Sequence, residues 1–307
     1  MRCAYVTHAD CMRHEMGAGH PESPARLAAI HDRLLFDGLL DFLSVHDAPL
    51  ATQEQLCRAH APEHVAHILA STPIEGYVAI DPDTCMNPHS AIAALRAAGA
   101  VVLATDLVLA GQADTAFCCV RPPGHHAERA AAMGFCFFDN VAVGIRHALE
   151  VHGLERVALV DFDVHHGNGS QDIFRDDPRV LMCSTYEIDL YPFPHDTSGA
   201  NMINVGLPPR SGGPAFRDAV ASRWLPAMED FAPQLVVVSA GFDGHRADDM
   251  GNLGLVEADF QWVTRELLAL ARRHCGGRIV SSLEGGYHLP SLARSVAAHV
   301  AVLAGAD

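Results

Sequence analysis

The chain has 307 residues, of which 49% are hydrophobic and 19% charged, and its 21 basic and 37 acidic side chains give a formal net charge of −16. The apolar fraction suffices for a buried core and excludes a disordered chain, and the length suits one α/β domain, 1–307. All 21 basic residues are arginine, and an acidic surface without lysine argues against a nucleic-acid partner. A cationic substrate would instead be favoured.

The cysteines and the first residues bear on where the protein works. The nine cysteines are odd in number and form no CxxC pair, so neither a disulfide framework nor a cysteine zinc knuckle is expected. No run of about 18 uninterrupted apolar residues occurs, and the polar Thr7 and His8 come too early for a signal peptide. We therefore expect a cytoplasmic protein without a membrane segment, and a homo-oligomer is compatible with these features.

Short apolar runs alternate with longer segments of helical periodicity. The predicted strands, in chain order, are 2–6, 116–120, 157–162, 180–185, 202–205, 235–240 and 278–283. Helices are predicted at 88–111, 216–231 and 256–267, where the sequence is Ala-rich or apolar residues recur every three or four positions. This alternation predicts a single parallel sheet with helices on both faces. In such sheets ligands bind beyond the carboxyl ends of the strands.

The most informative segment is 160–169, Val-Asp-Phe-Asp-Val-His-His-Gly-Asn-Gly, which begins at the end of a predicted strand. In an extended chain Asp161, Asp163 and His165 point to one side, because side chains alternate with a period of two. This arrangement is half of a metal site. The alternative is a helix N-terminal turn, but a cap needs one polar side chain and this segment offers several.

A further carboxylate, Asp243, follows the predicted strand 235–240. Taken alone, Asp243 suits a turn as well as a metal site. Together with an aspartate and a histidine from the neighbouring segment, it could surround a divalent ion with two oxygens and one nitrogen. Three protein ligands leave a position open for water, which is typical of a catalytic metal site.

Two more strand ends have polar side chains. His125 and His126 lie on a Pro/Gly-stiffened loop after 116–120, where paired imidazoles suit acid and base chemistry; a solvated pair of loop histidines is the alternative. After 278–283, two glycines would let Tyr287 turn towards a ligand.

Five segments in this order, RPPGHHA, GFCFFDN, DFDVHHGNG, SAGFDGHRADD and EGGYHL, resemble those of the zinc-dependent histone deacetylase family. The similarity is to its class II-like bacterial members, which include acetylpolyamine amidohydrolases and acetoin-utilisation proteins. It extends from about Gly19 to Leu289, nearly the whole chain. The resemblance implies the arginase/deacetylase α/β fold, which agrees with the predicted alternation of strands and helices.

The resemblance assigns one Zn²⁺ per chain to Asp163, His165 and Asp243. It makes His126 the general base and later the general acid, and His125 its polarising partner.

In the same family each tandem histidine is paired with a second group, here Asp161 for His125 and Asn168 for His126. An amide at 168 marks the class II pattern and should leave His126 less basic than a carboxylate would. Tyr287 corresponds to the phenol that hydrogen-bonds the oxyanion.

Other matches to the family are looser. A potassium ion is expected behind the zinc, held by Asp161 and Ser184 with backbone carbonyls of Asp163, His165 and Thr185. Arg26 matches an arginine that lines an internal acetate channel.

For the substrate tunnel, Gly134 and Phe135 resemble one wall and Phe193 the second. The gate position falls at Met250, which is apolar as in lysine deacylases, although two aspartates precede it. We therefore expect an acylated lysine or a similar acylated amine as substrate, with acetylpolyamines as the alternative. A manganese ureohydrolase would need more ligands, and a non-catalytic acyl-binding protein would have lost one of the reactive residues.

Overall fold

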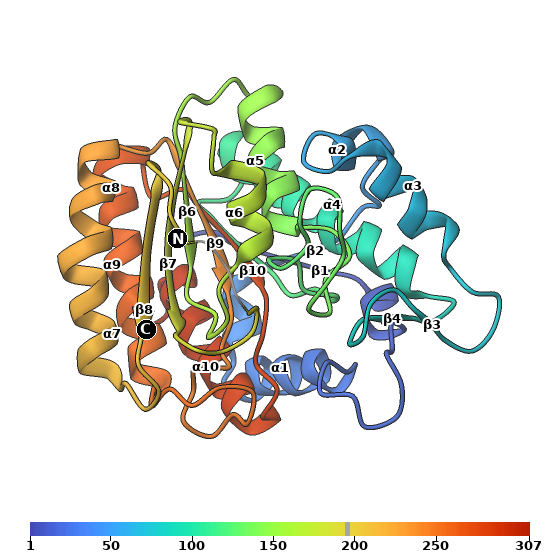
Figure 1. The fold of residues 1–307 in the computed structure, drawn as a ribbon. Helices are drawn as coiled ribbons and strands as arrows, with labels where there is room; N and C mark the ends of the chain where they lie inside the picture. Colours follow the sequence, from blue (N-terminus) through green and yellow to red (C-terminus); the bar gives the residue numbers. More distant parts are fainter. Residues whose placement is uncertain (194–196) are drawn as a thin grey trace.

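The computed structural model describes residues 1–193 and 197–307, and within them the central feature is an eight-stranded parallel sheet (Figure 1). In spatial order the strands are β2 (Leu43–Asp47), β1 (Cys3–Thr7), β5 (Thr115–Cys118), β10 (Ile279–Leu283), β9 (Leu235–Ala240), β6 (Val157–Asp161), β7 (Val180–Glu187) and β8 (Met202–Leu207). All seven predicted strands are present, and their ends differ from the predicted ones by at most two residues. The predicted parallel pairing is confirmed.

Two strand features were not predicted. The edge strand β2 has the sequence LSVHD and buries none of its residues fully, so it lacks the continuous apolar run that identifies a central strand. A small antiparallel hairpin, β3 (Val78–Ala79) with β4 (Cys85–Met86), has only two residues per strand. Strands this short show no detectable periodicity.

The helices lie on both faces of the sheet, as expected (Figure 1). Those described are α1 (Ala25–Phe36), α2 (Gln53–Cys57), α3 (Pro62–Ala70), α4 (Ser90–Leu109), α5 (Asn140–Glu150), α6 (Asn168–Phe174), α7 (Gly213–Ala219), α8 (Leu225–Phe231), α9 (Glu257–Cys275) and α10 (Leu289–Ala304). Helices α4 and α5 pack together on one side, and α1, α10 and α9 pack together on the other. The single helix predicted over 216–231 is interrupted by a π-helical turn, Val220–Trp224, between α7 and α8.

Helix α4 is unusually apolar. Among the described residues it is the one helix long and apolar enough to cross a membrane by length and composition. In this structure 67% of its most apolar window is buried inside the fold, where it contacts α5 and strands β1, β5 and β10. The apolar composition of α4 is therefore explained by its place in the core.

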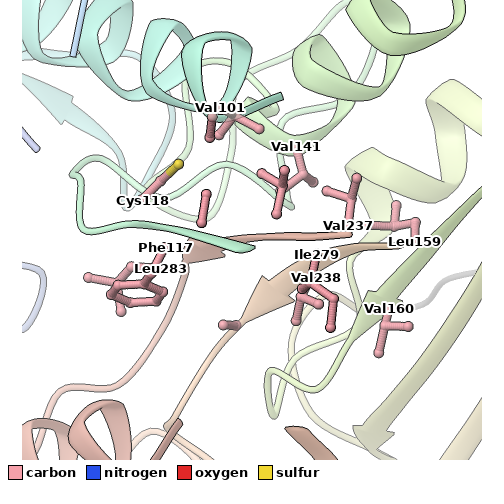
Figure 2. Close-up of a cluster of buried hydrophobic side chains, with 14 of the residues drawn as sticks. Val101, Phe117, Cys118, Val141, Leu159, Val160, Val237, Val238, Ile279 and Leu283 are labelled. Carbon is pink, nitrogen blue, oxygen red and sulfur yellow. The ribbon is translucent and has the colours of Figure 1, made fainter. Parts of the chain in front are cut away.

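Aliphatic side chains pack against both faces of the sheet and form the core. Figure 2 shows Val101 of α4 and Val141 of α5 on one side, near Val237, whereas Val160 and Val238 lie on the other. All five are buried. Consecutive residues of β9 thus serve opposite faces, as the alternation of side chains along a strand requires.

The strand order explains how distant segments of the chain meet. Strands β5, β10, β9 and β6 are neighbours, and each is followed by one of the polar segments singled out above. Because the strands are parallel, their carboxyl ends lie at the same edge of the sheet. The fold therefore brings the tandem histidines, Tyr287 and the expected metal ligands to one place.

The core contains a buried histidine where α10 meets α9 and β10. His299 of α10 is fully buried, and its ring nitrogens lie 2.7 Å from Thr264 Oγ1 and 2.9 Å from Ser281 Oγ. The rings of Phe117 and Phe242 surround it, with centroids 5.7 and 5.8 Å away. Burial lowers the pKa of His299 to about 3.

Replacing His299 with glutamine should flatten the pH dependence of stability. In the unfolded chain the histidine is protonated below about pH 6.5, whereas in the folded protein its pKa is about 3. As the pH is lowered through this range, this residue therefore decreases the free energy of unfolding by up to about 1.4 kcal/mol per pH unit. Urea unfolding between pH 7 and 4.5 measures the slope, with the exposed His67→Gln as control. Equal slopes for the parent and His299→Gln would contradict this account.

Candidate active site

The three residues expected to bind a metal lie together. Asp163 and His165 follow β6, and Asp243 follows β9. His165 Nδ1 lies 3.0 Å from Asp163 Oδ1 and 3.3 Å from Asp243 Oδ2, and one ligand atom from each residue lies within 4.8 Å of the others. All three side chains are buried.

The surroundings of these side chains fit a cation. Val164 N donates to Asp243 Oδ1 at 2.9 Å and Gly285 N donates to Asp163 Oδ2 at 2.9 Å, which orients both carboxylates. Burial and the neighbouring Asp163 carboxylate raise the pKa of Asp243 to about 6. A divalent ion would stabilise two carboxylates held this close, and two oxygens with one imidazole nitrogen suit zinc.

The backbone beside the ligands leaves no room for larger residues. A Cβ on Gly285 would lie 1.9 Å from Asp243 Oδ2, and one on Gly241 would lie 2.0 Å from Asp163 Oδ2. Glycine is therefore required at both positions so that the carboxylates can approach each other.

His126 presents a free ring nitrogen. Its Nδ1 lies 2.8 Å from Asn168 Oδ1, and Asn168 Nδ2 donates to Glu128 Oε1 at 2.9 Å. The carboxylate of Glu128 thus sets the orientation of the amide, so that its oxygen accepts the Nδ1 proton of His126. The lone pair of His126 is then on Nε2, as a general base requires.

The two tandem histidines have opposite electrostatic settings. Burial lowers the pKa of His126 well below its ordinary value, and the neighbouring His125 and His165 lower it further. Burial alone would also lower the pKa of His125, but Asp163 and Asp161 raise it well above its ordinary value. His125 Nδ1 lies 3.0 Å from Asp161 Oδ2. The surroundings of the two rings therefore shift their pKa values in opposite directions.

Tyr287 is held by two charged residues. Asp248 Oδ2 accepts from Tyr287 N at 2.6 Å and from His288 N at 2.9 Å. The guanidinium of Arg26 lies 4.8 Å from the centre of the phenol ring. Arg26 is fully buried and donates from Nε to Gly286 O at 2.6 Å. The phenol thus has a fixed place at the site.

A cavity of about 160 Å³ opens above these groups. It is lined by Asp83, His126, Gly134, Phe135, His165, Tyr191, Met250 and Tyr287. A reactive imidazole, a phenol, a metal-ligand candidate and an apolar wall therefore face the same space.

The second tunnel wall differs from the expectation. Phe193 is 64% exposed and does not line the cavity, whereas Tyr191 does, with its ring centroid 5.1 Å from that of His126. The segment has few apolar residues, so its sequence did not distinguish between the two aromatic rings. Asp83 was also missed, because it belongs to no recognised segment.

The first wall has an unusual backbone. Gly134 and Phe135 both have positive φ, at 56° and 69°. A Cβ on Gly134 would lie 2.5 Å from Cδ2 of His126, so glycine lets this wall pack directly against the His126 ring. A phenylalanine in the left-handed region is rare, and such strain is typical of functional sites.

The residues expected to hold a potassium ion lie next to the candidate metal ligands. Asp161 is paired in register with Ser184 of β7 on one side and with Ser239 of β9 on the other. Ser184 Oγ is buried and has no hydrogen-bond partner among the described residues. An unpaired buried hydroxyl beside a carboxylate fits a bound monovalent cation.

A second group of candidate ligands, Asp106, His147 and His152, lies between α4 and the end of α5. Both imidazole Nε2 atoms lie within hydrogen-bond distance of Asp106 Oδ1, at 2.8 and 2.6 Å. Arg58 lies 3.2 Å from His147 Nδ1 and can only donate, so the ring proton of His147 is on Nε2. A metal bound at Nε2 of His147 would need a lone pair on that atom, but the atom carries the proton. The arrangement therefore favours a hydrogen-bonded cluster over a metal site.

Comparison with known proteins agrees with this geometry. A family model for the histone deacetylase domain matches residues 20–303. A histone deacetylase-like amidohydrolase of Pseudomonas aeruginosa is 41% identical over 280 residues, covering 88% of this chain and 73% of that protein. Human polyamine deacetylase HDAC10 is 38% identical over 302 residues, covering 92% of this chain and 44% of that protein.

The solved structure of the HDA15 HD domain has a TM-score of 0.92 and 33% identity, covering 99% of this chain and 88% of that one. The expected arginase/deacetylase fold is thereby confirmed. The relatives are named as deacetylases and amidohydrolases, and this chain is likewise a hydrolase of amide bonds. The chain belongs to the histone deacetylase family.

Proposed function

We propose that residues 1–307 form one zinc-dependent catalytic domain that removes acetyl or other short acyl groups from acylated lysine or a similar acylated primary amine. The observation that supports this most is that His126, Tyr287 and the candidate ligand His165 line one cavity. A non-catalytic acyl-binding protein would not need a base and an oxyanion donor placed beside the same ligand set.

In this proposal Asp163, His165 and Asp243 hold zinc, which supplies Lewis-acid polarisation of the acyl carbonyl and a lowered pKa for water. His126 accepts the proton of the attacking water at Nε2. Tyr287 donates its hydroxyl proton in a hydrogen bond to the developing oxyanion, where one such donor is worth about 10²–10³ in rate. His126 then returns the proton to the leaving amine.

We also propose a structural potassium ion at Asp161 and Ser184, with backbone carbonyls of Asp163, His165 and Thr185. The unpaired buried hydroxyl of Ser184 supports it. A cation there would offset the burial of Asp161 while its Oδ2 still faces His125.

The gate segment favours an acylated lysine over an acetylpolyamine. The gate residue Met250 lines the cavity and is apolar. Of the two aspartates before it, Asp248 is buried and bound to the backbone of the Tyr287 segment, and Asp249 is exposed and does not line the cavity. The gate segment therefore places no carboxylate in the cavity. Asp83, on the β3–β4 loop, does line the cavity and could hold a polyamine cation, so acetylpolyamines stay the alternative. The relative named polyamine deacetylase keeps acetylpolyamines as the second candidate.

A manganese ureohydrolase is less well supported. It would need a second metal beside the first, but Asp161, the nearest further carboxylate, is bound to His125. Among the described residues, one three-ligand cluster occurs at this edge of the sheet.

The metal assignment can be tested by substitution. Purified protein should contain about one equivalent of divalent metal per chain, and Asp243→Ala should lose most of it, because removing one of three ligands leaves a single carboxylate and one imidazole. Elemental analysis after dialysis measures the content, with exposed Asp249→Ala as the matched control. Full metal retention by Asp243→Ala would show that the ligand set is different.

His126→Ala should lower kcat on an acetyl-lysine peptide by roughly 10²–10⁴, because one residue serves both proton transfers. Zinc content and the unfolding midpoint should stay close to those of the parent. His125→Ala should be less severe, since that ring only polarises its neighbour. Parent-like activity of His126→Ala would refute the mechanism.

The substrate assignment predicts higher kcat/KM for acetyl-lysine peptides than for N-acetylputrescine or N-acetylspermidine. Met250→Glu should shift this ratio towards the polyamines on the order of tenfold, as one charged hydrogen bond to a cation would. Met250→Leu serves as the control that keeps the gate apolar. A parent enzyme that prefers acetylpolyamines would reverse the assignment, and hydrolysis of arginine or agmatine alone would favour a ureohydrolase.

A further inference from the structure

A buried glutamate at the end of β10 lies against the turn that holds the tandem histidines. Glu284 is fully buried and follows the last residue of the strand. Its Oε2 accepts from Gly124 N at 2.6 Å and from His125 N at 3.1 Å. Glu284 does not line the cavity, and among the described residues its side chain hydrogen-bonds only to this backbone.

The two amides depend on this one oxygen. Within the described residues neither has another acceptor, and a buried amide left without a hydrogen bond is destabilising. The turn is packed closely on its other side, where a Cβ on Gly124 would lie 2.5 Å from Asn140 N. Without the carboxylate oxygen the turn would therefore have to shift to satisfy its amides, and the space for that shift is small.

The same turn is bound at other points. His125 O accepts from Gly169 N at 3.0 Å and from Ser170 N at 3.2 Å, at the start of α6. The rings beyond it are paired with Asp161 and Asn168. These contacts tie the turn to β6 and α6, whereas Glu284 ties it to β10, the strand that leads to Tyr287.

We infer that Glu284 is a positioning residue, whose side-chain oxygen sets the tandem-histidine turn in register with the Tyr287 segment. It acts as a hydrogen-bond acceptor. The second oxygen, Oε1, has no hydrogen-bond partner among the described residues, so only one oxygen is engaged. A glutamine amide oxygen can take its place, whereas a methionine of similar length cannot.

The test compares Glu284→Gln with Glu284→Met in the zinc-loaded protein. Glu284→Met should lower kcat by about 10- to 100-fold with KM nearly unchanged, because a small misplacement of a catalytic group costs rate and not binding. Glu284→Gln should keep kcat within about threefold of the parent, since an oxygen acceptor remains. Zinc content should be the same in all three proteins.

Hydrogen exchange of the segment 121–128 gives a readout independent of activity. Exchange should be faster in Glu284→Met than in the parent, and parent-like in Glu284→Gln. Gln234 provides the matched control, because its Oε1 likewise accepts from two consecutive amides, Glu155 N at 2.7 Å and Arg156 N at 3.0 Å, before the amino ends of β9 and β6. Gln234→Ala should speed exchange around 155–156 and leave kcat unchanged.

The inference rests on the proposed roles of the tandem histidines, but the two can fail separately. Unchanged exchange and kcat in Glu284→Met would overturn the positioning role while leaving the deacylase intact. Should Glu284→Met fail to fold, a loss of kcat above about tenfold in Glu284→Gln would overturn it as well. The parent protein could also fail to cleave any acyl amide while Glu284→Met still shows faster exchange. That result would support the positioning of the turn and refute the proposed function.

Discussion

Several carboxylates are buried at one edge of the sheet, and offsetting their desolvation dominates the structure around them. Asp161, Asp163, Asp243 and Glu284 are each at most 1% exposed. Isolated charges of this kind would cost several kcal/mol each, so each must be paired, hydrogen-bonded or neutralised. Backbone amides supply part of the compensation, the imidazoles of His125 and His165 supply another part, and the proposed cations supply the rest. Binding of the proposed cations would therefore be linked to folding.

Much of the fold could be predicted from local patterns. The β-branched runs of β6 and β9 identify buried parallel strands, because both faces of such strands are covered and the usual alternation of polar and apolar residues is absent. Asp163 and His165 were expected to share one side because side chains of an extended chain alternate. In the structure β6 ends at Asp161 and residues 163–165 form a bend, in which Asp163 Oδ1 accepts from His165 N. The edge strand β2 was missed because its exposed side chains remove that signal.

The remaining parts of the site depend on tertiary contacts that local patterns do not encode. Tyr191, and not Phe193, forms the second wall, because the choice depends on how an irregular segment packs against His126. Asp83 reaches the cavity from the loop within the β3–β4 hairpin. This loop does not follow any of the parallel strands whose carboxyl ends were predicted to carry the site. The contact of Glu284 joins residues about 160 positions apart and gives no local signal.

The five residues after β10 touch nearly every part of the site. Glu284 binds the tandem-histidine turn, Gly285 N binds Asp163, Gly286 O accepts from Arg26, and the amides of Tyr287 and His288 bind Asp248. One short peptide thus positions the proposed base, the proposed metal ligand and the proposed oxyanion donor. Substitutions that seem remote from each other share this peptide, so their energetic effects should not add. An insertion or deletion of a single residue here would change all these contacts at once, so the length of this segment is fixed by the site that surrounds it.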